Sequence, residues 1–306
     1  MTSSHVASTL LVPLDGSELA ETALGYAKLL GSPDTTYVLL RVTPANGHLA
    51  GRVDPERLSA AASSIEAEFK QSAAMLGAGA KVSLLTASGD PATLIVEQAA
   101  AIGATAIVIA THGRGAIGRW LHGSISDRVA RTSPIPVVIL RGDEGGTTPH
   151  ELTRILLPYD GSETARAVIP AAGDIALAQG LQVHILTAVD VTSIAPVSVP
   201  GAVMPVSGDI YEEVYDQLVA EARTEAATAA ALFHDRGITA TTEVRVGPPA
   251  VAVEDVLQPG DLIALSSHGR SGVQRWLLGS VAEQLIRAAP APVMLVPAAG
   301  RETATA

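Results

Sequence analysis

The chain has 306 residues, of which 47% are hydrophobic, 17% charged and only 3% aromatic. This composition can bury a sizeable core of aliphatic side chains, and it excludes an intrinsically disordered protein. The formal net charge of −11 argues against binding to nucleic acids or membrane surfaces, which are themselves polyanionic. Cysteine is absent, which excludes disulfides, thiolate catalysis and cysteine-ligated metal sites.

In the first half of the chain, short aliphatic runs alternate with longer amphipathic segments. Aliphatic residues fill most of these runs, which is typical of strands covered on both faces. The alternation predicts a parallel sheet with right-handed crossovers, a doubly wound α/β sandwich whose ligands bind beyond the carboxyl ends of the strands. We predict strands at Thr9–Leu14, Tyr37–Val42, Lys81–Ala87, Ala106–Ala110 and Val137–Leu140, and helices at Glu18–Leu30, Pro55–Leu76, Pro91–Ile102 and Ser124–Thr132.

The second half repeats the first. LLVPLDGSE (10–18) corresponds to ILLPYDGSE (155–163), HGRGAIGRWLHGS (112–124) to HGRSGVQRWLLGS (268–280), and RTSPIPVVIL (131–140) to RAAPAPVMLV (287–296). Such internal repetition indicates two homologous units. We therefore predict domains at residues 1–142 and 151–306, with the glycine-rich, charged stretch 141–151 as the linker.

The stretch Gly113–Gly118 matches the G-x-G-x-x-G pattern of dinucleotide-binding turns. However, Gly118 does not lead directly into a helix, and no acidic residue ends the strand that follows. The aligned stretch of the second repeat, Gly269–Gln274, also lacks the second and third glycines of the pattern. We therefore reject the dinucleotide interpretation.

The pattern that both repeats share is a glycine (Gly113, Gly269), then nine intervening residues, then Gly-Ser (Gly123-Ser124, Gly279-Ser280). A glycine after a strand lets the backbone approach a ligand, and the free N–H groups at a helix start bind anions. Arg114 or Arg119, and in the second repeat Arg270 or Arg275, could add positive charge beside such a site. The alternative is that Gly-Ser simply starts a helix, because serine is a favoured N-cap.

An aspartate follows the first strand of each repeat, Asp15 in the first and Asp160 in the second. At this edge of the sheet a carboxylate can accept hydrogen bonds from ribose hydroxyls or hold a hydrated Mg²⁺ beside phosphates. An Asp-Gly turn between strand and helix would explain the same residues equally well. Both interpretations stay open.

At these residues the chain resembles the universal stress protein family, over nearly its whole length. The nucleotide-binding members of that family carry G-2x-G-9x-G-[S/T] after the fourth strand, and here Ala110 and Ser266 replace the leading glycine. The resemblance implies two tandem five-stranded parallel α/β sandwiches that pair through their last strands as an internal pseudo-dimer. It also implies ATP as the ligand, with Mg²⁺. The candidate binding residues are Pro13, Asp15, Val42, Ile109, Ala110, Gly113, Arg114, Gly123, Ser124 and Ile125 in the first repeat, and Pro158, Asp160, Ala188, Leu265, Ser266, Gly269, Arg270, Gly279, Ser280 and Val281 in the second.

Signals for catalysis are weak. His112 and His268 recur beside the glycine loop, but no nucleophile or acid accompanies them at a recognisable spacing, and the P-loop, H-E-x-x-H and G-x-S-x-G motifs are absent. The segment 191–210 is an insertion that could be a disordered loop or a lid over the second site.

We expect a cytoplasmic, ATP-binding sensor or regulator of the stress response with little or no turnover. Its protein partner is unknown, it binds neither nucleic acid nor membrane, and association of tandem chains into a homodimer is left open. The alternatives are a nucleotide-free protein-interaction module of the same fold and, third, a slow ATPase.

Overall fold

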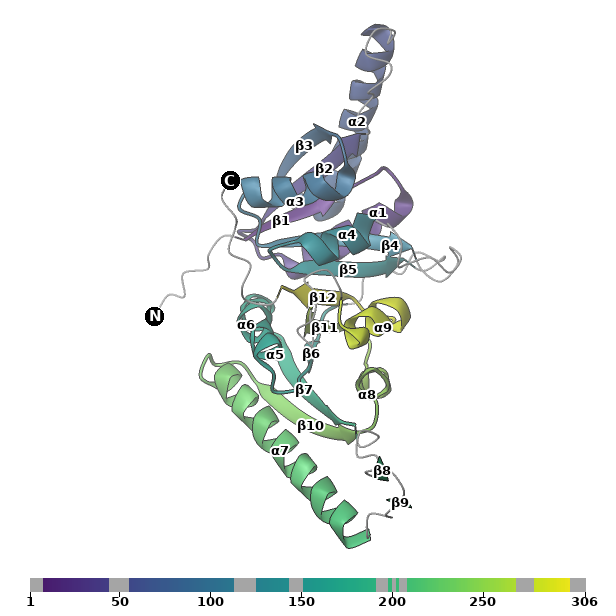
Figure 1. The fold of residues 1–306 in the computed structure, drawn as a ribbon. Coiled ribbons are helices and arrows are strands. Elements are labelled where there is room, and N and C mark those ends of the chain that lie inside the picture. The colour runs from purple at the N-terminus through teal and green to yellow at the C-terminus, as the bar shows by residue number, and fades with distance from the viewer. Residues whose placement is uncertain are drawn as a thin grey trace.

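The computed structural model describes residues 8–43, 55–112, 125–142, 151–190, 198–199, 202–203, 208–267 and 278–297. Each half forms an alternating α/β unit (Figure 1). The first contains β1 (Thr9–Pro13), α1 (Glu18–Leu30), β2 (Thr36–Thr43), α2 (Pro55–Leu76), β3 (Lys81–Ser88), α3 (Pro91–Ala101), β4 (Ala106–His112), α4 (Ile125–Thr132) and β5 (Val137–Gly142). The second contains β6 (Arg154–Pro158), α5 (Glu163–Arg166), α6 (Val168–Gln179), β7 (Gln182–Val189), α7 (Gly208–His234), β10 (Ala240–Val246), α8 (Pro249–Val256), β11 (Asp261–Ser266), α9 (Ser280–Ala288) and β12 (Val293–Val296).

The two units share one sheet, ordered β10-β7-β6-β11-β12-β5-β4-β1-β2-β3. Within this sheet the neighbouring strands of each unit run parallel, whereas β12 and β5 pair antiparallel, with Met294 opposite Val138. This pair relates the two units by an approximate two-fold axis. The predicted doubly wound fold and the internal pseudo-dimer through the last strands are both confirmed.

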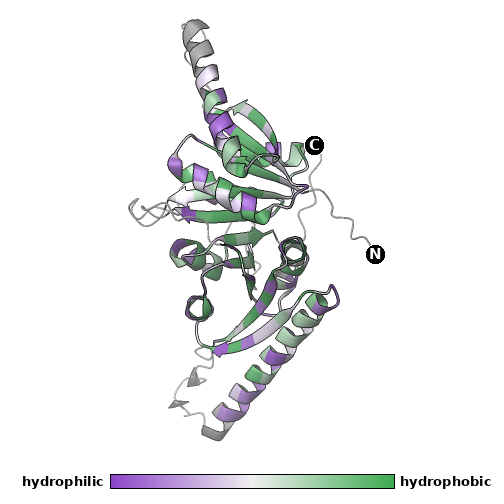
Figure 2. Cartoon of the chain, turned by 180° about the vertical axis from the view of Figure 1, so that it is seen from behind, coloured by the Kyte–Doolittle hydropathy of each residue, from purple (hydrophilic) through white to green (hydrophobic). Residues whose placement is uncertain are grey.

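Helices cover both faces of this sheet, and the strand residues alternate between two apolar cores. Leu10 and Val12 of β1 join the core under α1, α2, α6 and α7, while Leu11 between them joins the core under α3, α4, α8 and α9. Both cores contain residues of both units, so they continue across the β5–β12 pair. Figure 2 shows that apolar residues dominate the central strands, whereas the helices carry apolar and polar residues in mixture.

The outermost strand β3 corrects one expectation. It is among the strands predicted to be covered on both faces, yet its residues are exposed or only half-buried, and Leu84 is 45% exposed. Its sequence, KVSLLTAS, also carries polar residues at four of its eight positions. The reason is position, because β3 pairs with β2 alone and the helices cover this edge of the sheet incompletely.

The second domain departs locally from the first. The single helix α1 corresponds to two helices, α5 and α6, with a break at Ala167 just before Pro170, whose ring prevents a continuous helical hydrogen-bond pattern. Within the insertion 191–210, the described residues form an antiparallel pair, β8 (Ser198–Val199) with β9 (Ala202–Val203), and the start of α7. Most of the insertion lies outside the described residues, as does the predicted linker core at 143–150.

Candidate functional site

A cavity of about 330 Å³ opens at the carboxyl edge of the sheet in the second domain. It lies where the strand order reverses between β6 and β11, the position at which ligands bind in open α/β sheets. Its volume is within the range of small-molecule sites, roughly 300–1,000 Å³. The lining residues are Pro158, Tyr159, Asp160, Ser162, Thr164, Ala165, Leu186, Ala188, Pro249, Val253, Leu265, Ser266, Gly279, Ser280, Val281 and Ala282.

The cavity combines an apolar wall with a polar rim. Pro158, Ala188 and Leu265 come from the ends of three neighbouring strands, and Val281 adds a side chain from α9. Asp160 and Ser280 supply polar groups at the same opening. Such a surface can receive a flat apolar ring on one side and hydrogen-bonding or anionic groups on the other.

Helix α9 begins at this cavity without a capping side chain. Gly279 is the N-cap, with φ −63° and ψ 148°, and as a glycine it has no side chain that could cap the first turn. Helices α1 and α5 differ in this respect, because Ser17 and Ser162 cap them through hydrogen bonds from Ala20 and Ala165. The start of α9 therefore keeps the uncapped N–H groups and the positive dipole end that bind anions.

Ser280, the serine of the second Gly-Ser pair, is not the N-cap of its helix, as the helix-start interpretation would require. A favoured N-cap serine would precede the helix, whereas Ser280 is the first residue of α9 and is exposed at the cavity. The backbone N–H of Gly279 donates to the carbonyl of Ser267 at 3.2 Å, which anchors this helix start to the end of β11. Ser280 thus presents its hydroxyl at the cavity.

Both aspartates take part in turns. The Oδ1 atom of Asp160 accepts hydrogen bonds from the backbone N–H and the hydroxyl of Ser162, at 3.1 and 2.6 Å. Asp15 makes the same pair of contacts with Ser17, at 2.9 and 2.6 Å. Burial alone would raise the pKa of Asp15, but the Ser17 hydrogen bonds and the charge of Arg41 lower it below its ordinary value. The turn interpretation is therefore realised in both repeats, and it leaves Asp160 at the cavity wall.

The first-domain counterparts occupy equivalent strand positions. Pro13 ends β1 and pairs with Leu40 of β2, as Pro158 of β6 pairs with Leu186 of β7. Val42 lies in β2, Ile109 and Ala110 lie in β4, and Ile125 begins α4 with an exposed side chain. The remaining candidates lie outside the described residues, namely Gly113, Arg114, Gly123 and Ser124, with Gly269 and Arg270 of the second repeat and His268. His112 is the last residue of β4.

The loop that follows the first strand has different charged neighbours in the two domains. In the first domain, a Cβ on Gly16 would lie 2.7 Å from Nη1 of Arg41, so this guanidinium contacts the loop, and it pairs with Glu68 at 3.6 Å. In the second domain Thr187 takes the position of Arg41, as the strand registers of β1–β2 and β6–β7 show. Glu225 of α7 contacts the Gly161 loop instead and pairs with Arg166 at 3.3 Å.

Sequence reasoning missed half of the cavity lining. Pro249 and Val253 of α8 form part of the wall, as do Tyr159, Thr164 and Leu186. One signal was available, because a Pro-Ala pair opens α3 and α8 alike, at Pro91 and Pro249. The other residues follow no pattern that points to a ligand.

Metal-binding groups do not gather in the described part of the chain. No cluster of three or more histidine, cysteine, aspartate or glutamate side chains arises there. Asp160 is the carboxylate among the cavity-lining residues. A single carboxylate suits a hydrated Mg²⁺ held mainly by a ligand's phosphates rather than a protein cage. Across the described residues, we also find no helix with the length and apolarity needed to cross a membrane.

Comparisons with known proteins agree with this architecture. A universal stress protein of Mycolicibacterium smegmatis is 29% identical over 193 residues, covering 62% of this chain and 60% of the relative. One of Methanocaldococcus jannaschii is 29% identical over 145 residues, covering 47% of this chain and 81% of the relative. The match to the mycobacterial relatives thus spans 60% of their length.

Among solved structures, a universal stress protein of Archaeoglobus fulgidus superposes with a TM-score of 0.60 at 23% identity, covering 96% of this chain and 97% of that one. This likeness shows a shared fold. The sequence profile of the universal stress protein family matches residues 7–141 and, a second time, residues 151–297. Since these two matches cover both halves, the chain belongs to the universal stress protein family.

Proposed function

We propose that this protein binds ATP, with its adenosine part in the second-domain cavity and its phosphates at the start of α9. The observation that carries the proposal is the union of an apolar cavity at the sheet switch point with an uncapped helix N-terminus. Gly279 and Ser280 would hold the phosphates, Asp160 the ribose or a hydrated Mg²⁺, and Pro158, Ala188 and Leu265 the adenine. The equivalent residues of the first repeat would form a second site.

The protein acts in this proposal as a nucleotide-dependent regulator of the stress response, not as a turnover enzyme. The ionisable side chains that line the cavity in the described residues are Tyr159 and Asp160. Asp160 already accepts two hydrogen bonds from Ser162, which does not favour a role as the base that activates water. A cytoplasmic location, an unidentified protein partner and the absence of nucleic-acid binding remain expectations from composition and charge.

Ligand release and calorimetry test the proposal. Acid release from freshly purified protein, analysed by mass spectrometry, should yield adenine nucleotide, and added ATP should raise the melting temperature. Gly279→Trp should abolish ATP binding in the second domain, because a bulky side chain would fill the phosphate end of the cavity. Leu177→Trp is the matched control, since Leu177 is an exposed residue of α6 that is not part of the cavity lining.

The outcomes separate the candidate functions. Unchanged ATP affinity in both Gly279→Trp and Gly123→Trp would refute the site assignment. No binding at millimolar ATP would leave the nucleotide-free interaction module as the better function. Steady phosphate release that Asp15→Asn and Asp160→Asn abolish would instead establish a slow ATPase.

A further inference from the structure

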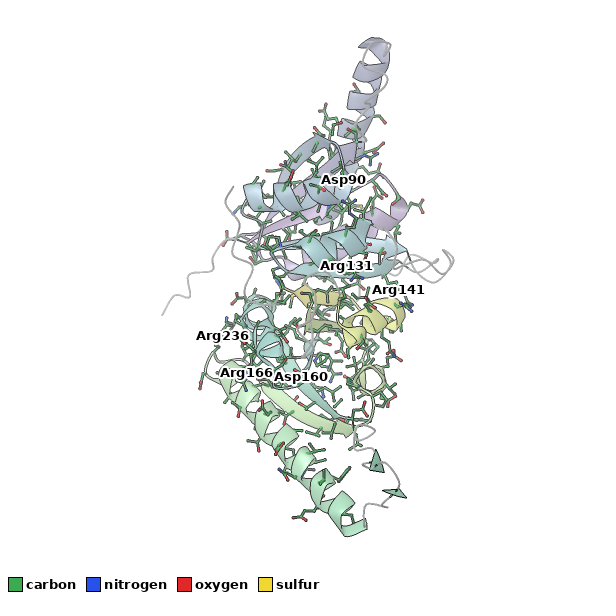
Figure 3. The ribbon with its side chains drawn as sticks, in the orientation of Figure 1. Asp90, Arg131, Arg141, Asp160, Arg166 and Arg236 are labelled. Carbon is green, nitrogen blue, oxygen red and sulfur yellow. The ribbon has the colours of Figure 1, made fainter. Side chains whose placement is uncertain are left out.

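Helix α9, which starts at the second-domain cavity, is held at both ends by arginines of the first domain (Figure 3). Near its start, Nη2 of Arg131 pairs with Oε1 of Glu283 at 3.2 Å. At its end, Nη1 of Arg141 donates to the carbonyls of Arg287 and Ala288, at 2.9 and 3.0 Å. The first domain therefore contacts the helix that carries the proposed phosphate site.

The Arg131 guanidinium is largely buried between two carboxylates. Its Nε donates to Oδ1 of Asp127 at 2.9 Å, and the side chain of Arg131 is 14% exposed. Burial alone would lower the pKa of Arg131, but the contacts with Asp127 and Glu283 raise it above its ordinary value. The cation is thus fixed in place at the boundary between α4 and α9.

Glu283 lies in the first turn of α9 and immediately follows the cavity-lining residues 279–282 in the chain. Its backbone N–H donates to the carbonyl of Gly279 at 2.9 Å, and its side chain is 25% exposed. A carboxylate in a first turn suits the helix dipole, but it repels an anionic ligand bound at the same helix start. The only charged residue in the cavity lining itself is Asp160, so the lining supplies no cation that would offset Glu283 within the described residues.

We propose that Arg131 of the first domain is a positioning residue for the second-domain site, where it neutralises and holds Glu283 so that the start of α9 accepts a triphosphate. This inference rests on the proposed function. It adds that the nucleotide affinity of one domain depends on a cation supplied by the other. A triphosphate should respond to this pair, whereas adenosine, which carries no phosphate charge, should not.

The test measures ATP and adenosine affinity by calorimetry in full-length protein carrying Gly123→Trp, which silences the first-domain site. Arg131→Gln should weaken ATP binding about fivefold, the effect expected for one uncompensated charge near the ligand, and leave adenosine binding within about twofold. Adding Glu283→Gln to Arg131→Gln should restore ATP affinity, because the repelling carboxylate is then gone. Arg128→Gln is the matched control, since this arginine of the same helix pairs with Asp90 inside the first domain.

A second variant covers the case in which Arg131→Gln does not fold, because it leaves Asp127 buried. Glu283→Gln alone keeps the Arg131–Asp127 pair and should tighten ATP binding at least twofold. The inference is overturned if Glu283→Gln leaves ATP affinity unchanged or weaker, if Arg131→Gln matches Arg128→Gln, or if adenosine weakens as much as ATP. If the protein binds neither ATP nor adenosine, the proposed function itself is refuted. If it binds ATP tightly and none of these variants changes the affinity, only the role of Arg131 is refuted.

Discussion

Removing one partner of the buried ion pair between Arg154 and Asp261 should destabilise the protein far more than removing one partner of an exposed pair of the same geometry. Nε and Nη2 of Arg154 donate to the two carboxylate oxygens of Asp261 at 2.6 and 2.9 Å, and Nη2 also donates to the carbonyl of Val256 at 2.7 Å. The side chain of Asp261 is 0% exposed and also accepts from the backbone N–H of Gln258 at 2.8 Å. Arg154→Met would therefore leave a buried carboxylate without its cation.

The size of this destabilisation follows from the complete burial of the Asp261 side chain. Breaking a buried pair by removing one partner costs about 3–5 kcal/mol, because the remaining charge stays desolvated. Unfolding entropy near the midpoint is about 0.6 kcal/mol per kelvin for a chain of 306 residues. The melting temperature of Arg154→Met should therefore fall by about 5–8 °C. We expect one cooperative transition, because both apolar cores include residues of both domains.

Arg128→Met provides the comparison. Nη1 and Nη2 of Arg128 donate to the two carboxylate oxygens of Asp90, both at 2.8 Å, but both side chains are 47% exposed. Exposed pairs contribute only about 0–1 kcal/mol, so the midpoint should move by less than about 2 °C. Urea unfolding and calorimetry measure both variants. Equal destabilisation of the two would refute the reasoning from burial, and a change in ATP affinity in Arg154→Met would contradict its placement at the opposite edge of the sheet.

Three further predictions address the cavity, the first-domain loop and the core. Ala188→Phe should reduce ATP binding at least tenfold by filling the cavity wall, with adenosine lost in parallel, as calorimetry would show; retained affinity would refute the adenine placement. Asp15→Asn should lower the free energy of unfolding at neutral pH, because the folded state with its lowered Asp15 pKa favours the ionised carboxylate. The stability difference from wild type should disappear as the pH falls below 3.8 and through that lowered pKa, where the carboxyl group becomes protonated. A difference in urea midpoints that does not change with pH would contradict this. Leu156→Ala, at a fully buried β6 position, should cost about 2–5 kcal/mol in urea unfolding, and a loss below 1 kcal/mol would show that the site collapses around the change.

Much of the fold was predictable from local sequence, because each strand carries its own signal. Alternate residues of β1 enter opposite cores, so a strand covered on both faces must be aliphatic throughout, and that run is visible without the structure. The predicted helices Glu18–Leu30 and Pro55–Leu76 agree with α1 and α2 at both ends. The same rule failed at β3, an edge strand whose sequence is not aliphatic throughout, because Lys81, Ser83, Thr86 and Ser88 are polar.

The candidate site was predictable only where the repeats mark it. Eight of the ten second-repeat candidates line the cavity, and Gly269 and Arg270, the other two, lie outside the described residues. The matched Gly-Ser and Pro-x-Asp positions recur because both domains shape the same strand ends. The wall formed by Pro249 and Val253 was not predicted, since a proline at a helix start and a valine within the helix indicate packing as readily as ligand contact.

The sequence by itself determined the two repeats, their strand–helix order and the residues at the carboxyl ends of the first and fourth strands of each. These features follow from the burial pattern and turn chemistry of neighbouring residues, which the chain carries locally. The family resemblance already implied pairing through the last strands, but only the tertiary structure decided its register, with Met294 of β12 opposite Val138 of β5. It alone also decided that Arg131 lies against Glu283, 152 residues further along the chain. Such contacts depend on how the folded surfaces of the two domains pack together, and the hydrophobic periodicity within either repeat carries no information about that packing.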